Sequence, residues 1–228
     1  MAQVETHGAP GTGPATTPME RKRLVAAGGG GVAEAIAAIA AVVLSIVGLA
    51  GGTPGYMLTI AIIALGASFL FEGAAVAARY STLLSETHEH QHAEVGSGIA
   101  AEAVAGVAGI ALGILALLGI SPLTLAAIAV IVFGGAMLLG GGAHARLNAL
   151  RPAYAAGDVT QRVAQEAVFV TSGGQILIGI GAIVLGILAL LGMSPLMLAL
   201  IATLGIGGSM LLSGTAIGTR MLSVLHHF

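Results

Sequence analysis

The sequence predicts an all-α, polytopic membrane protein with six transmembrane helices arranged as three tandem hairpin repeats. Hydrophobic residues make up 57% of its 228 residues and charged residues only 8%, with a mean hydropathy of +1.01. A water-exposed domain needs far more charge on its surface. The second observation is a repeat, because the stretch GILALLGISPL at 113–123 returns at 186–196 with one change. A more divergent copy ends at Pro54, so the unit is used three times.

Each copy joins two apolar runs through a tight break. The break ends in a hydroxyl residue and a proline, at Thr53-Pro54, Ser121-Pro122 and Ser194-Pro195. A Ser or Thr side chain suits a helix N-cap, because its oxygen can accept an orphaned backbone N–H. Proline suits the first helical position, where a missing N–H costs nothing. Each unit is therefore predicted to be a helical hairpin.

In chain order, residues 1–24 are polar and predict a disordered tail without a cleaved signal peptide. The transmembrane domain is predicted over 25–228, with repeats at about 29–80, 96–147 and 169–222. Its apolar runs are each long enough to cross roughly 30 Å of hydrocarbon. They are predicted near 31–51, 55–79, 96–118, 122–145, 169–191 and 195–221, with charged connections at 80–95 and 146–168 between hairpins.

The basic residues predict the orientation. If the chain crosses the membrane six times as predicted, all eight Lys and Arg residues lie on the same side of the membrane. They are Arg21, Lys22, Arg23, Arg79, Arg146, Arg151, Arg162 and Arg220. Cytoplasmic segments carry an excess of Lys and Arg, so both termini and both long connections are predicted to be cytoplasmic.

The chain has thirty-six glycines, and many of them lie in the apolar runs, Gly109 and Gly135 among them. Lipid provides no hydrophobic drive between helices, so association depends on close approach at small residues. We expect these glycines to pack the bundle, and self-association in the lipid membrane is an additional use that the pattern permits.

Polar residues recur at one position of the repeat. Alignment on the prolines places Glu34, Glu102 and Gln175 at the same position, near the cytoplasmic edge of the hydrocarbon core. Glu72 lies at a comparable depth on the first return helix, where the other repeats have Gly140 and Ser213. Two interpretations remain open: a structural polar ring that reaches water or pairs with arginines, or a vestibule for protons or cations.

The connection at 80–95 contains a second polar cluster. His88, Glu89 and His92 form an H-E-x-x-H string, the spacing at which two imidazoles share a helical face and bind zinc. Zinc held by His88, His92 and Glu94, a pH-responsive patch, a protease and a solvated linker are the alternatives. A segment this rich in His and Glu produces the string easily, so the linker is the favoured interpretation.

Composition excludes several functions. The chain has no cysteine, which excludes thiol catalysis and thiolate metal sites, and its net charge of −2 without a basic stripe argues against nucleic acid. No nucleophile elbow, Walker loop or dinucleotide fingerprint is present. We therefore expect a protein that is not an enzyme, with no catalytic residues and no cofactor other than the zinc considered above.

The repeated hairpin G-x-L-x-L-L-G-x-[ST]-P-L, followed by a helix with a glycine at Gly66, Gly134 or Gly207, resembles the short repeat of HdeD-like acid-resistance membrane proteins. The resemblance covers about 30–222. It implies a six-helix protein of the bacterial plasma membrane with a link to acid stress. The leading expectation is thus a structural or stress response protein that forms homo-oligomers, and the alternative is a proton or cation conduit.

The histidine cluster gives a testable prediction. Imidazole binds zinc only when deprotonated, and it takes up its proton at about pH 6.5. Calorimetry at about pH 7.5 should therefore show zinc binding that is lost at about pH 5. A His88→Ala, His92→Ala variant should bind no zinc at either pH. Equal binding by this variant would leave the segment as a solvated linker.

Overall fold

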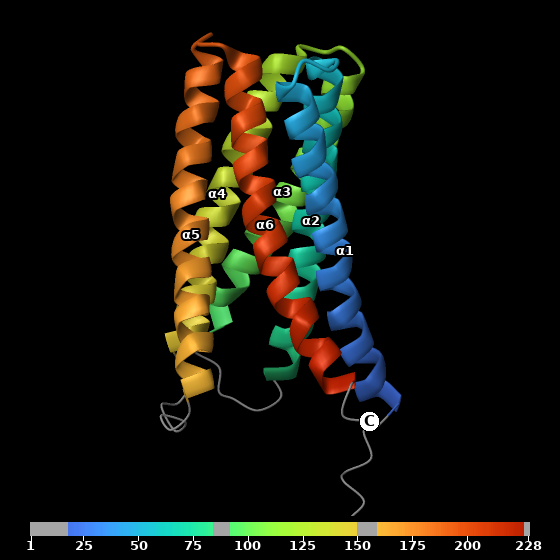
Figure 1. The fold of residues 1–228 in the computed structure, drawn as a ribbon, viewed down its shortest axis with the longest axis vertical. Coiled ribbons are helices and arrows are strands. Elements are labelled where there is room, and N and C mark those ends of the chain that lie inside the picture. Colours follow the sequence, from blue (N-terminus) through green and yellow to red (C-terminus); the bar gives the residue numbers. More distant parts are fainter. Residues whose placement is uncertain (1–17, 84–91, 150–158, 226–228) are drawn as a thin grey trace, which may run out of the picture.

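The computed structural model describes residues 18–83, 92–149 and 159–225, and the side chains of 32–74, 100–141 and 173–213. Over these residues the chain is all-helical, which confirms the predicted fold class (Figure 1). Six helices are each long and apolar enough to cross a membrane. They are α1 (Pro18–Leu49), α2 (Pro54–Leu83), α3 (His92–Leu117), α4 (Pro122–Ala149), α5 (Val159–Leu190) and α6 (Pro195–Leu225).

The helices extend beyond the predicted apolar runs. Helix α1 begins at Pro18, inside the predicted tail of 1–24, and the other helices also reach into the predicted connections. The residues just after Pro18 are Met, Glu, Arg and Lys, which are good helix formers although they are polar. Once the apolar run fixes a helix, adding further turns is favourable, so propensity prevails over composition.

The tight turns all lie at one end of the bundle, which we call the turn end (Figure 1). Helices α2, α4 and α6 begin at their prolines, as predicted. The backbone oxygens of Thr53, Ser121 and Ser194 each accept the first hydrogen bond of the helix, from the N–H four residues later, with 3.1 Å between nitrogen and oxygen. These three residues therefore occupy the predicted N-cap position. The two serines have φ values of 39° and 42°, in the left-handed region that non-glycine residues seldom adopt.

The packing order places three helices inside and three outside. Helices α2, α4 and α6 contact one another, while α1 lies against α2 and α6, α3 against α2 and α4, and α5 against α4 and α6. Helices at equivalent places in the repeat therefore have equivalent neighbours. That the three hairpins are copies of one unit stays a prediction from the sequence.

Glycines let an inner helix approach the next outer helix closely. A Cβ added at Gly66 of α2 would lie 2.8 Å from the backbone oxygen of Gly106 in α3, and one added at Gly106 would lie 2.7 Å from the oxygen of Gly66. Gly134 of α4 and Gly179 of α5 make the same contact, at 2.6 and 2.7 Å. Any side chain would force these backbones apart, so both interfaces need glycine.

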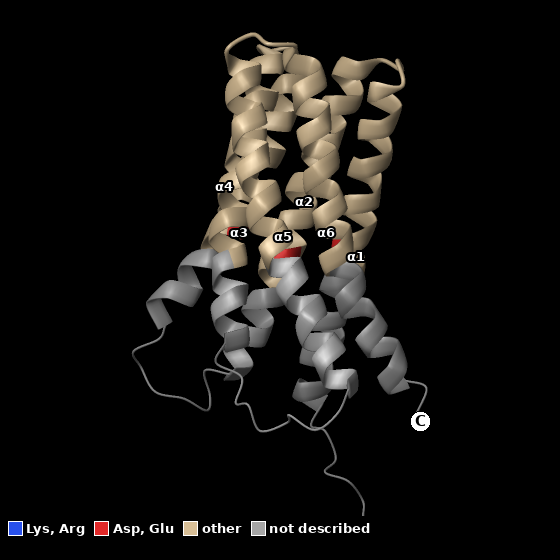
Figure 2. Cartoon of the chain, turned by 60° about the vertical axis from the view of Figure 1, so that its left-hand side comes forward, with Lys and Arg blue, Asp and Glu red and all other residues tan. Residues whose placement is uncertain are grey.

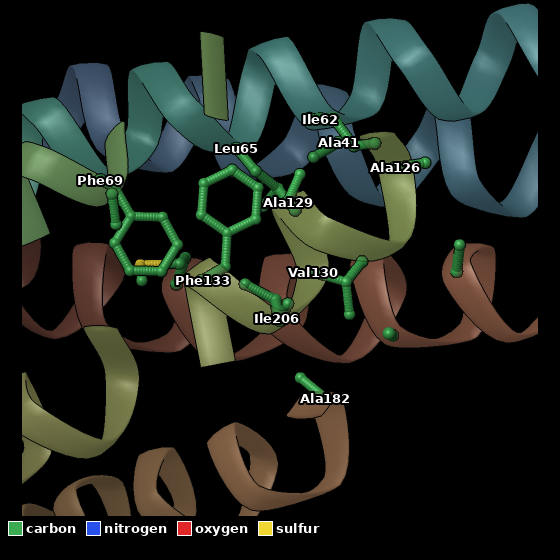
Figure 3. Close-up of a cluster of buried hydrophobic side chains, with 14 of the residues drawn as sticks. Ala41, Ile62, Leu65, Phe69, Ala126, Ala129, Val130, Phe133, Ala182 and Ile206 are labelled. Carbon is green, nitrogen blue, oxygen red and sulfur yellow. The ribbon is translucent and has the colours of Figure 1, made fainter. Parts of the chain in front are cut away.

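The inner helices enclose an apolar core (Figure 3). Its largest side chains are Phe69 of α2 and Phe133 of α4, whose rings stack with centroids 5.0 Å apart. Leu65, Ile206 and Met137 pack around them and are also buried. Large apolar side chains on the outer helices are instead exposed, as suits a surface that faces lipid tails.

Two glycines predicted to pack the bundle have different surroundings. A Cβ at Gly109 of α3 would overlap the ring of Phe133, whereas one at Gly135 of α4 would have no atom within 4 Å. Gly109→Leu should therefore lower the free energy of unfolding in detergent by about 1–3 kcal/mol. Gly135→Leu, the matched control, should leave it unchanged. A lower free energy of unfolding or a smaller oligomer for Gly135→Leu would place that glycine between copies of the chain.

Candidate functional site: a buried polar layer

The predicted polar residues lie together inside the bundle. We define the polar layer as Glu34 on α1, Glu72 on α2, Glu102 on α3, Gln175 on α5 and Ser213 on α6. The three glutamates are 0–4% exposed and Gln175 is 6% exposed. In Figure 2 the acidic positions lie at one level, towards the end of the bundle opposite the turn end. The helices thus bring four predicted site residues and Ser213 into one region.

Two of the carboxyl groups accept hydrogen bonds across helix interfaces. The hydroxyl of Ser213 lies 2.8 Å from Glu34 Oε1 and 2.9 Å from the backbone oxygen of Met210, so its one proton is shared between them. Gln175 Nε2 donates to Glu72 Oε1 over 3.4 Å. The Ser68 hydroxyl donates to the backbone oxygen of Glu34 over 3.2 Å. These bonds tie α1 to α6, α2 to α5 and α2 to α1.

Glu102 has a different environment. Its carboxyl group packs against Gly140 of α4, so closely that a Cβ at that glycine would overlap Oε1. It also interacts electrostatically with the carboxyl groups of Glu72 and Glu34. Oε2 of Glu102 and Oε2 of Glu72 are buried without a hydrogen-bond partner. Two buried acceptors therefore lack a donor.

The layer has an excess of acid. The three glutamates are the only charged residues in 32–74, 100–141 and 173–213, the segments whose side chains the structure describes. A buried carboxylate without a counter-charge is costly, and like charges nearby increase the cost. A proton or a bound cation removes that cost. Chemically, the polar layer is therefore an acceptor for positive charge.

The carboxyl groups do not converge as ligands of one metal ion. Among the described residues, no group of three or more His, Asp or Glu side chains could hold a metal. A hard cation such as Ca²⁺ needs six to eight oxygens at about 2.3–2.6 Å, which requires such convergence. A proton needs one oxygen only. Each carboxyl group of the polar layer can therefore take up a proton without such convergence.

Sequence reasoning placed these residues near the membrane edge, where they could reach water. The polar ring and the vestibule both require these side chains to gather at one end of the bundle, and in the structure they are buried inside it. Glu102 and Gln175 lie four residues before the interfacial glycines Gly106 and Gly179, on the same helix face. That Ser213 is a donor and that Gly140 is a neighbour of Glu102 were not predicted from the sequence. The repeat alignment contained a signal for both residues, since Ser213 and Gly140 occupy the repeat position of Glu72.

The histidine cluster lies mostly outside the described residues. Helix α3 begins at His92, so His92 and Glu94 are in its first turn, but their side chains are not described. His88 lies outside the described residues altogether. The zinc site stays a prediction.

The Gln175–Glu72 contact gives a prediction. Gln175→Leu removes the donor to Glu72 and leaves a further buried acceptor unsatisfied, so the free energy of unfolding should fall by about 1–3 kcal/mol. Gln175→Glu is the matched variant. At low pH its protonated side chain can donate as glutamine does, whereas at high pH it adds a like charge, so its destabilisation should grow as the pH rises. Chemical unfolding in detergent at two pH values measures both. Equal stability of Gln175→Leu and the parent would show that this hydrogen bond contributes nothing.

A scan against protein-family models, a search of curated proteins and a search of solved structures find no match to this chain.

Proposed function

We propose that this integral membrane protein takes up and releases protons at the polar layer. The observation that carries the proposal is the group of three interacting, buried carboxyl groups in described segments that contain no basic residue. An ionisable residue that faces the interior of a transmembrane bundle is expensive and usually functional. A purely structural ring would be cheaper if it were built from amides and hydroxyls.

The proposed proton exchange is one-sided. Between the polar layer and the turn end, the inner helices fill the axis with buried apolar side chains, beginning with Phe69 one turn from Glu72. Leu65, Phe133 and Ile206 continue this core. These residues offer no hydrogen-bonding groups. The buried hydroxyls of Ser45 and Thr203, between α1 and α6, bond to each other and to backbone oxygens of their own helices. In place of the conduit considered from the sequence, we therefore propose a site that takes up and releases protons only through the end of the bundle opposite the turn end.

Cellular context follows from the sequence. The distribution of Lys and Arg supports cytoplasmic termini, so the polar layer would exchange protons with the cytoplasm. The resemblance to HdeD-like proteins supports a bacterial plasma membrane and a role in acid stress, which suits a proton-binding protein. The mechanism has no chemical step beyond proton transfer, in line with the expectation that the protein is not an enzyme. Self-association stays part of this proposal through the glycine-lined helices.

Infrared difference spectroscopy tests the proposal. Between high and low pH, the reconstituted protein should show the C=O band of carboxyl groups that become protonated in apolar surroundings. The variant Glu34→Gln, Glu72→Gln, Glu102→Gln should lose this band, because amides cannot take up the proton. Glu166→Gln, an acid outside the polar layer, is the control and should keep it.

Two outcomes would contradict the proposal. If the triple variant keeps the whole band, the polar layer exchanges no proton and a structural role remains. If liposomes with the parent protein collapse a pH gradient that the triple variant preserves, protons cross the protein. That result would replace the one-sided site with a conduit.

A further inference from the structure

The three carboxyl groups of the polar layer are not equivalent. Glu34 accepts from Ser213 and Glu72 accepts from Gln175, each through Oε1. No hydrogen bond to Glu102 is found among the described side chains, and its Oε2 is buried without a partner. Glu102 is only 2% exposed, so water cannot readily supply the missing donor.

Gly140 provides the space that Glu102 occupies. A Cβ at this glycine would overlap Glu102 Oε1 and would lie 3.0 Å from the carboxyl carbon and 3.4 Å from Cγ. At the same repeat position, α2 has Glu72 and α6 has Ser213. A side chain of either kind on α4 would push the Glu102 carboxyl group out of its place. The absence of a side chain at residue 140 therefore leaves the space in which the carboxyl group lies.

We propose that Glu102 is the residue of the polar layer that carries the exchangeable proton, and that Gly140 is its positioning residue. This inference rests on the proposed function. With a proton, the Glu102 carboxyl group is neutral and no longer needs a hydrogen-bond donor from its surroundings. Protonation also removes one of the like charges of the polar layer. The facing titratable groups on the described parts of neighbouring helices are Glu72 on α2 and Glu34 on α1. Helix α4 faces Glu102 with Gly140, which does not titrate.

A hydrophobic carbodiimide probes this directly. A protonated carboxyl group in apolar surroundings adds across one C=N bond of dicyclohexylcarbodiimide: its oxygen bonds to the central carbon and its proton goes to nitrogen. The resulting O-acylisourea rearranges by an oxygen-to-nitrogen acyl shift to a stable N-acylurea. Peptide mass spectrometry of the full chain in liposomes should find Glu102 labelled severalfold faster than Glu34 and Glu72. Labelling of Glu102 should fall as the pH rises. Faster labelling of Glu34 or Glu72 would overturn the assignment to Glu102.

Substitution on α4 tests the positioning role. Gly140→Ala should reduce labelling of Glu102 severalfold, whereas Gly135→Ala on the same helix, with open space around its Cβ, should not change it. The double variant Gly140→Ala, Glu102→Asp shortens the acid by one methylene and should restore labelling at residue 102. Restored labelling in the double variant would show that Gly140→Ala displaces the carboxyl group and does not misfold the bundle. Unchanged labelling in Gly140→Ala, or no restoration in a double variant with native helical circular dichroism, would overturn the role of Gly140.

The infrared band separates this inference from the function on which it rests. A band lost in the triple glutamate variant but retained in Glu102→Gln would leave the protein a proton binder and refute Glu102 as the carrier. A band that survives in the triple variant would refute the proposed function itself.

Discussion

The backbone contacts of Gly66 with Gly106 and of Gly134 with Gly179 are the constraint on which the rest of the bundle depends. Lipid tails are as apolar as leucine, so packing at small residues has to hold these helices together. The contacts also determine which residues face inwards. Glu102 lies one helical turn before Gly106, so the face that brings the backbones together also carries the carboxyl group into the interior. Helix association and burial of the polar layer are therefore consequences of the same contacts.

The interface between α6 and α1 closes the bundle differently. Gly207 faces Ala38, whose backbone oxygen would lie 3.5 Å from an added Cβ, so this contact is looser than the two glycine pairs. Deeper in the same interface, Ser45 and Thr203 lie 2.9 Å apart and are fully buried. Such a bond contributes only about 0.6–2 kcal/mol in a membrane, but it requires one register. Hydrogen bonds thus supplement backbone contact where the chain's first and last helices meet.

The sequence predicted the helices well, because hydropathy and the Ser-Pro and Thr-Pro breaks are local signals that tertiary packing does not override. It predicted the beginning of α1 poorly, since the polar residues after Pro18 are helix formers in spite of their composition. Repeat alignment identified Glu34, Glu102 and Gln175 as a set. It could not establish that Gln175 donates to Glu72, because that contact joins helices 103 residues apart in the chain. The sequence indicated how far along its helix each residue lies, whereas the direction of each side chain depended on packing between helices.

The polar layer departs from the repeat in a way that accounts for its chemistry. Where each inner helix meets the next outer helix, the repeat position pairs Ser213 with Glu34, Glu72 with Glu102, and Gly140 with Gln175. In the first pair, the Ser213 hydroxyl donates to Glu34 Oε1. The second pair has two acids and no donor, and the third has an amide and a glycine. The third pair therefore complements the second: Gln175 donates to Glu72, and Gly140 leaves room for Glu102. Three identical repeats would have distributed donors and acids evenly. This unequal set leaves Glu102 without a hydrogen-bond donor among the described side chains, which is why we propose that it carries the exchangeable proton.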